Sequence, residues 1–330
     1  MIDNIETNPI PQHILRSNES FFTHEDFIET DIIFYSEHFI ITKAVLPTLK
    51  GSELIAIKRP YRPQYATNNI KNVIIKEAVI TNKLCEHKNI IGVFDWGRKD
   101  IPWIAIEYFD GGTLYKEKEN MSFIQSLWTS IMITKALNYS HRNGVIHNDI
   151  KTTNIGLQKT SKFWKTPKII DWSSAIENSG WTPAISKKIS IKNLPEGFIN
   201  PLPNKVIKGD PITYSPEQIM NSNNIDSKSD IYQTGSMLYH LFTGVPTFDN
   251  LDSDMTRKKQ EENRKKMILN VYKDPKRPST IADVPELIDD ILLKALKTRK
   301  EDRYQHIHQL ERDLVRVYNE EAASHHPKVY

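Results

Sequence analysis

The alternation of apolar and polar residues first indicates a strand and a helix in the amino-terminal third of the chain. Residues 53–60 (ELIAIKRP) alternate, which predicts a strand that carries Lys58 near its end. Residues 72–91 (NVIIKEAVITNKLCEHKNII) repeat their apolar positions with a period near 3.6, which predicts a helix that contains Glu77.

Four polar groups that suit phosphate and metal chemistry lie close together in the middle of the sequence. The segment HNDIKTTN places Asp149 and Asn154 five positions apart, with Lys151 between them. Asp171 follows a short apolar run that predicts the edge of a strand. Asparagine and aspartate oxygens suit Mg²⁺, and phosphoryl transfer depends mainly on positioning and charge neutralisation. The pattern therefore favours ATP-dependent phosphoryl transfer.

Several segments resemble the motifs of eukaryotic-type protein kinases and follow the order typical of that family. HNDIKTTN resembles the catalytic loop HRDLKxxN, IIDWSSA at 169–175 resembles the metal-binding DFG region, and AIK at 56–58 is similar to the VAIK strand. GDPITYSPEQ at 209–218 resembles the substrate-binding loop, and residues 226–244 resemble the buried helix that follows it. Lys151, two residues after Asp149, resembles the serine/threonine branch of the family.

This resemblance implies an ATP- and Mg²⁺-dependent protein kinase that transfers the γ-phosphate to serine or threonine hydroxyls of a protein substrate. It assigns the reacting groups and the phosphates to six residues: Asp149 as catalytic base, Lys151 at the γ-phosphate, Asn154 and Asp171 as magnesium ligands, and Lys58, held by Glu77, at the α- and β-phosphates.

The resemblance also assigns residues to the nucleotide base and to the large lobe. The segment WIAIEYFDGGTLYK resembles the hinge that joins the lobes, with Ile106 as gatekeeper and the backbones of Glu107 and Phe109 facing the adenine. Ala56 and Ile170 complete the implied nucleotide site. Glu217, at the end of the motif that resembles APE, is expected to pair with Arg303 in a structural role.

The fold implied by the resemblance is a two-lobed α+β protein-kinase fold. Its small lobe would combine an antiparallel sheet with one helix, and its larger lobe would be mainly helical. The expected boundaries follow the motifs: an N-terminal extension at 1–25, the small lobe at 26–108, the large lobe at 109–320 with an activation segment at 171–217, and a tail at 321–330.

The chain departs from the family pattern in several places. The first glycine of the chain is Gly51, so the glycine-rich loop is absent, and residues 36–38 would form the turn in its place. Asn148 stands where the family has an arginine that holds a phosphorylated residue, so we expect activity without phosphorylation of the activation segment. Gly156 replaces a bulky apolar residue below the adenine, so we expect a roomy nucleotide pocket.

Composition adds few constraints. A chain of 330 residues, 38% of them hydrophobic, is long enough for a two-lobed enzyme. The formal net charge of +3 predicts no nucleic-acid partner, and the chain has no run of about twenty apolar residues to span a membrane. The single cysteine, Cys85, suits a reducing compartment. We therefore expect a cytoplasmic protein, or one in a host cytosol if it is a secreted effector; the oligomeric state stays open.

Two other functions remain open from the sequence. A pseudokinase, which would keep the fold as a scaffold or binding module, is favoured by the missing glycine-rich loop and by Asn148. A small-molecule kinase of the aminoglycoside or choline type would share motifs similar to HxDxxxxN and IDW. The SPE motif at 215–217 and Arg303 favour the protein-kinase interpretation over the small-molecule one.

Overall fold

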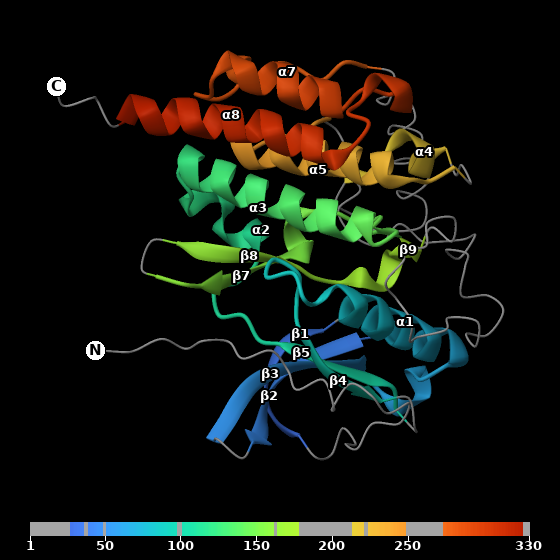
Figure 1. Ribbon diagram of the computed structural model, residues 1–330. Helices are drawn as coiled ribbons and strands as arrows, with labels where there is room; N and C mark the ends of the chain where they lie inside the picture. The colour runs from blue at the N-terminus through green and yellow to red at the C-terminus, as the bar shows by residue number, and fades with distance from the viewer. Residues whose placement is uncertain are drawn as a thin grey trace. The chain divides into compact units, whose positions relative to one another are not determined.

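The computed structural model describes residues 27–35, 39–48, 51–97, 101–161, 164–177, 213–220, 224–248 and 273–325 (Figure 1). The chain forms two compact units. The first comprises the described residues within Met1–Glu86 and Ile91–Tyr108, and the second those within His87–Ile90 and Phe109–Tyr330. The α+β class expected from the sequence is confirmed, because the first unit is built on an antiparallel sheet and the second is mainly helical.

The sheet of the first unit has five antiparallel strands in the order β1-β2-β3-β5-β4. They are β1 (Ile28–Tyr35), β2 (Phe39–Thr48), β3 (Gly51–Pro60), β4 (Val93–Gly97) and β5 (Trp103–Glu107). In β3, Ile55 and Ile57 belong to a buried cluster with Trp103 and its neighbours on β2 and β5. Because side chains alternate along a strand, Ala56 and Lys58 lie on the opposite face.

Helix α1 (Asn68–Leu84) belongs to the first unit, and Thr67 caps it by accepting the backbone N–H of Ile70. The predicted helix over 72–91 is wrong at its carboxyl end. Ile90 forms a bridge with Ile169, and the Asn89 side chain donates to the carbonyl of Pro167 at 2.8 Å. The apolar pattern therefore continues past Leu84 because the residues near Ile90 are buried against a strand, although they are not helical.

The second unit contains six described α-helices and two small antiparallel pairs of strands. The helices are α2 (Leu114–Glu117), α3 (Phe123–Arg142), α4 (Pro216–Ile219), α5 (Ser227–Thr243), α7 (Glu286–Ala295) and α8 (Ile307–His325). The strand pairs are β6 (Val145–Ile146) with β9 (Ile176–Glu177), and β7 (Ile155–Lys159) with β8 (Lys165–Ile169). Helix α8 continues five residues beyond the expected end of the large lobe at 320.

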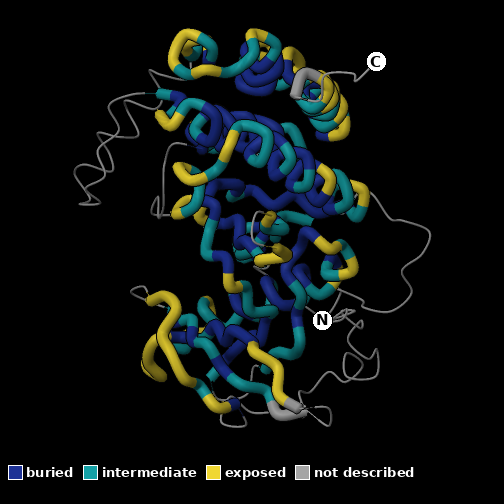
Figure 2. The backbone as a smooth tube through the Cα atoms, turned by 90° about the vertical axis from the view of Figure 1, so that its left-hand side faces the viewer, coloured by how far each residue is buried: buried dark blue, intermediate teal, exposed yellow. Residues whose placement is uncertain are grey.

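Helix α5 lies in the core of the second unit, where buried residues run along the packed helices (Figure 2). It begins at the N-cap Asp226 and ends at Gly244, whose φ of +74° favours glycine. Two polar residues of α5, Asp230 and Gln233, are fully buried. Buried polar groups need hydrogen-bond partners, and those partners lie in the loop that follows β6. No helix in the described part of the chain is long and apolar enough to cross a membrane.

Candidate active site

In the first unit, Lys58 and Glu77 form a buried ion pair. The Lys58 Nζ lies 2.7 Å from the Glu77 Oε2, and both residues are less than a tenth exposed. Lys58 occupies β3, between Ile41 of β2 and Ile104 of β5 in the sheet, and Glu77 lies on the buried face of α1. Since a buried charge needs a partner, each side chain fixes the other.

The residues expected to face the adenine in this unit are brought together by strand register. Ala56 of β3 lies directly opposite Ile106 of β5, and both are buried. Glu107 follows Ile106, and its backbone N–H donates to the carbonyl of Gly92 at 2.9 Å. Its side-chain Oε2 accepts the N–H of Gly92 at 3.2 Å. The Ile106 end of this apolar pair is therefore held in place by two hydrogen bonds between Glu107 and Gly92.

In the second unit, the loop after β6 gathers Asp149, Lys151 and Asn154. The Lys151 Nζ donates to the Asp149 Oδ2 at 2.9 Å. The Asn154 Nδ2 donates to the same oxygen at 3.1 Å and to the Asp149 carbonyl at 2.8 Å. The carboxylate is thus oriented by a cation and an amide. Because the Asn154 Nδ2 faces Asp149, its Oδ1 is the end of the amide that could bind a metal ion.

Asp171, the other expected metal ligand, follows β8, which pairs with β7 directly after Asn154. Ile155 lies opposite Ile169, and the Ile170 N–H donates to the Asn154 carbonyl at 3.0 Å. Asp171 has a φ of +59°, in the left-handed region that asparagine and aspartate tolerate better than most residues. Adjacent strands therefore carry an amide and a carboxylate, a hard-oxygen set that fits Mg²⁺.

His147 connects the loop to the Asp171 segment. Its Nδ1 accepts the backbone N–H of Asp149 at 3.2 Å, so the Nε2 carries the proton and donates to the Ile170 carbonyl at 3.1 Å. Its ring packs edge-on against Trp172, with the centroids 4.6 Å apart. Burial lowers the pKa of His147 and outweighs the nearby carboxylates of Asp230 and Asp149, which favours the neutral ring.

Sequence reasoning missed the buried side chains that hold this loop. The Asp230 carboxylate accepts the N–H of His147 at 2.9 Å and of Asn148 at 2.7 Å. The Gln233 Oε1 accepts the N–H of Ile150 at 2.8 Å. A carboxylate and a long side-chain amide in a helix that was expected to be buried were the signal that could have identified both residues.

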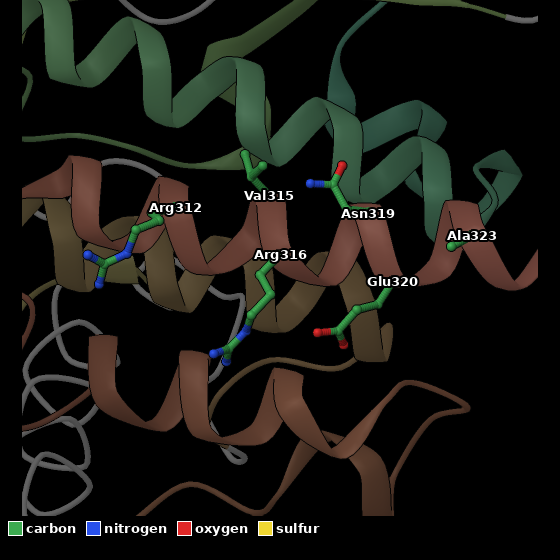
Figure 3. A pocket seen from close by; sticks show the side chains of 6 residues that line it. All are labelled: Arg312, Val315, Arg316, Asn319, Glu320 and Ala323. Atoms are coloured by element: carbon green, nitrogen blue, oxygen red, sulfur yellow. The ribbon is translucent and has the colours of Figure 1, made fainter.

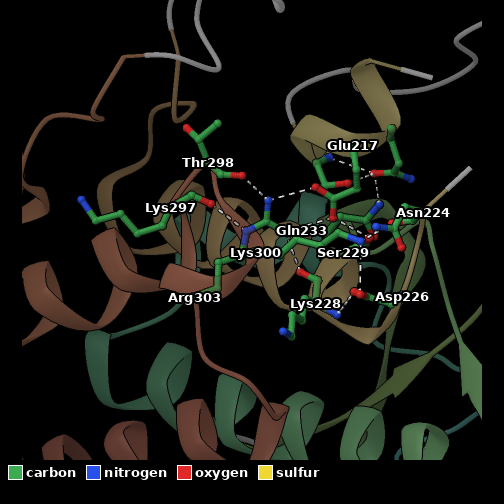
Figure 4. A network of polar contacts seen from close by, with 12 residues as sticks. Glu217, Asn224, Asp226, Lys228, Ser229, Gln233, Lys297, Thr298, Lys300 and Arg303 are labelled. Atoms are coloured by element: carbon green, nitrogen blue, oxygen red, sulfur yellow. Dashed lines mark hydrogen bonds and ion pairs between the residues drawn. The ribbon is translucent and has the colours of Figure 1, made fainter. Parts of the chain in front are cut away.

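Glu217 of α4 forms a bidentate pair with Arg303, and Figure 4 shows this network. The two N–H···O distances are 3.0 and 2.9 Å, and Ser229 donates its hydroxyl to the Glu217 Oε1 at 2.6 Å. Arg303 also donates to the carbonyls of Lys297, Lys228 and Thr298. Burial raises the pKa of Glu217, but its bonds to Arg303 and Ser229 outweigh burial and lower the net pKa.

Gly156, which led us to expect a roomy nucleotide pocket, lies directly against the ring of Phe109. A Cβ on Gly156 would lie 2.9 Å from two atoms of the Phe109 ring. The ring therefore occupies the space that glycine leaves. Nearby backbone contacts hold this arrangement, because the Gly111 N–H donates to the Leu157 carbonyl at 2.8 Å and Thr113 bridges to Gly156.

Two expected features fall where the structure gives no description. The turn at 36–38 and residues 178–212 of the activation segment lie outside the described residues.

A shallow surface groove of about 460 Å³ runs along α8 (Figure 3), lined by Arg312, Val315, Arg316, Asn319, Glu320 and Ala323. None of the predicted site residues lines this groove.

Comparison with known proteins finds a matching family model and similar proteins. A family model described as the protein kinase domain matches residues 46–314. The serine/threonine-protein kinase PknB of Mycobacterium leprae is 30% identical over 242 residues, which cover 71% of this chain and 34% of that protein. The probable serine/threonine-protein kinase PknB of Corynebacterium glutamicum is 27% identical over 317 residues, covering 92% and 44%. The chain thus spans less than half the length of these relatives.

The Glu217–Arg303 pair predicts a specific loss of stability in acid. Glu217→Gln should lower the free energy of unfolding by about 3–5 kcal/mol near neutral pH, because it leaves the Arg303 charge buried without its partner. The pKa of Glu217 is lower in the folded state than in the unfolded state. The pair therefore stabilises the folded protein fully at pH values above the unfolded pKa, and this contribution is lost as the pH falls through the folded pKa. The gap between wild type and variant should therefore narrow below about pH 4.

Urea unfolding of both proteins across that pH range measures the gap. Glu301→Gln is the matched control, because Glu301 pairs with Arg299 at the exposed surface. A gap that stayed constant with pH would contradict the assigned charge state of Glu217.

The Phe109–Gly156 contact predicts coupling between the two positions. Phe109→Ala should destabilise the wild type, because it opens a space beside Gly156. The same change should have little effect in a Gly156→Leu background, where the leucine side chain already fills that space. We expect a coupling of about 0.5–3 kcal/mol in a double-mutant cycle of unfolding free energies. Strictly additive effects would show that the ring does not occupy the space beside Gly156.

Proposed function

Because the chain belongs to the protein kinase family, we propose that it transfers the γ-phosphate of ATP, with Mg²⁺, to serine or threonine hydroxyls of a protein substrate. The observation that carries the proposal is the oriented carboxylate of Asp149, which Lys151 and Asn154 contact through the same oxygen. Phosphoryl transfer depends on positioned charges more than on covalent chemistry, and this loop supplies positioned charges.

Asp149 is the proposed base. Its carboxylate orients the substrate hydroxyl and accepts the hydroxyl proton as the oxygen attacks phosphorus. Lys151 reaches the same carboxylate oxygen, at 2.9 Å, so its ammonium lies where it can contact the transferring phosphate. Asn154 and Asp171 are the residues that would hold magnesium ions. Bound Mg²⁺ would neutralise the charge on the phosphate oxygens.

Lys58 is the proposed contact of the α- and β-phosphates. Its buried pair with Glu77 holds the ammonium in place before the nucleotide binds, so little reorganisation is needed at that moment. Ala56, Ile106, Glu107, Phe109 and Ile170 are the proposed nucleotide-binding residues, and the Phe109 ring takes the place of the side chain that Gly156 lacks.

The other functions are less well supported. A scaffold without catalysis has no physical need for a hydrogen-bonded Asp149, Lys151 and Asn154, or for the buried Lys58–Glu77 pair. A small-molecule kinase does not account for a family match that extends through residue 314. We also propose a cytoplasmic location, which would be a host cytosol for a secreted effector. For the protein substrate, the proposal specifies only the acceptor group, which is a serine or threonine hydroxyl.

Asp149→Ala should abolish transfer and leave the fold intact. Loss of a general base that also orients the substrate should lower turnover by at least about 100-fold. The measurement is incorporation of label from γ-labelled ATP and Mg²⁺ into a basic acceptor protein. Asp290→Ala, at an exposed position of α7, is the control. Equal incorporation by wild type and Asp149→Ala would rule out the proposed base.

Lys58→Met should lower turnover, and it should also destabilise the first unit because Glu77 loses its buried partner. The double variant Lys58→Met/Glu77→Gln separates these effects, since it removes both charges. We expect it to recover much of the thermal stability but none of the turnover. Lys83→Met, at an exposed position of α1, controls for loss of a lysine. Wild-type turnover in the double variant would contradict the proposed role of Lys58.

A further inference from the structure

Three side-chain amides meet directly beside the proposed base. They belong to Asn148, which precedes Asp149, to Gln218 at the end of the described substrate-loop segment, and to Gln233 of the buried helix α5. The Gln218 Nε2 donates to the Asn148 carbonyl at 3.0 Å and to its Oδ1 at 2.8 Å. The Gln233 Nε2 donates to the Asn148 carbonyl at 3.1 Å and to the Gln218 Oε1 at 2.7 Å.

Backbone groups fix the orientation of both glutamine amides. The Gln218 Oε1 accepts the N–H of Ser215 at 2.8 Å, and a backbone N–H can only donate. The Gln218 Nε2 must therefore face the Asn148 carbonyl, which can only accept. In the same way, the Gln233 Oε1 accepts the N–H of Ile150, which directs its Nε2 toward Asn148. Each amide thus has only one orientation that satisfies its neighbours.

Asn148 completes the network and extends it to a third segment. Its φ is +65°, and its Nδ2 donates to the Ser174 carbonyl at 3.3 Å, three residues after the proposed metal ligand Asp171. Its Oδ1 is then left to accept from Gln218. Asn148 and Gln233 are almost completely buried. One residue therefore joins the base loop, the metal-ligand segment and the substrate loop without a net charge.

We propose that Gln218 and Gln233 are positioning residues for Asp149, and that this neutral amide network couples the substrate loop to the base. The inference rests on the proposed function. Gln233 fixes the peptide groups on both sides of Asp149, through the Asn148 carbonyl and the Ile150 N–H. Gln218 adds the link to Ser215 and α4. Because the amides carry no charge, no phosphorylated residue is needed to neutralise the network.

The first experiment compares Gln218→Glu with wild type by steady-state kinetics. The carboxylate keeps the acceptor for Ser215 but places oxygen against the Asn148 carbonyl and Oδ1, so the two donated hydrogen bonds are lost. We expect kcat to fall about 10- to 100-fold while the KM for ATP changes less than about threefold, as for a misplaced base. A purely structural role would instead lower the folded fraction and leave the kcat of folded enzyme unchanged.

The matched control is Gln125→Glu. Gln125 occupies the same position in the helix-capping motif of α3, in the first turn of that helix, where its Oε1 accepts the N–H of Ser122 at 2.9 Å. This variant should keep wild-type kcat. Thermal unfolding of each variant reports the folded fraction at the assay temperature. Wild-type kcat in Gln218→Glu, or an equal loss in Gln125→Glu, would overturn the proposal.

A second test does not depend on a buried glutamate. Asn148→Gly removes the side-chain amide and tolerates the positive φ. If the network acts as a unit, Asn148→Gly/Gln218→Ala should lose no more kcat than the more damaging single change. Losses that multiply would overturn the coupling. Phosphatase-treated wild type should keep its kcat within about a factor of two, and a larger fall would show that a phosphate is needed for positioning.

These outcomes distinguish the inference from the proposed function. If wild type transfers no phosphate under any condition, the proposed function fails and the positioning role falls with it. If wild type is active, Asp149→Ala is inactive and Gln218→Glu is unimpaired, the proposed function stands and only the amide network is excluded from catalysis.

Discussion

The buried carboxylate of Asp230 is the constraint on which the candidate active site depends. It lies in the core of the second unit and accepts the backbone N–H groups of two successive residues, His147 and Asn148, and it also contacts the Nε2 of His141 at 2.7 Å. Burying a carboxylate is unfavourable unless several donors surround it. The observed path of the loop before Asp149 is therefore favoured, because another path would deprive the carboxylate of its two backbone donors.

The groups around this loop are oriented by the same principle. His147 has one tautomer that satisfies the backbone of Asp149 and Ile170, and the amides of Gln218 and Gln233 each have one orientation that satisfies theirs. A buried network in which every donor meets an acceptor is rigid, because each change of rotamer breaks several hydrogen bonds. Rigidity of this kind fits a reaction whose rate depends on placing charges accurately.

Local patterns predicted the parts of the site whose chemistry is local. The spacing within HNDIKTTN identified Asp149, Lys151 and Asn154 as a group. Helical periodicity placed Glu77 on a helix, and the family resemblance paired it with Lys58. The long-range contacts were not predictable in this way. Gln218 and Gln233 reach Asn148 across 70 and 85 residues, and no periodicity relates those positions. Gly156 indicated missing volume, but only the structure shows that Phe109 fills it. The absence of an arginine at position 148 likewise indicated a lost contact. It did not predict that other side-chain amides surround Asn148.

The most direct test of the account is phosphoamino-acid analysis of protein labelled by the wild-type chain with γ-labelled ATP and Mg²⁺. The account predicts label on serine or threonine, because Lys151 beside Asp149 is the feature that favours those acceptors. Label confined to tyrosine would contradict the assigned acceptor. The absence of transferred label from folded, nucleotide-binding protein would contradict the catalytic role assigned to Asp149 and favour a binding module.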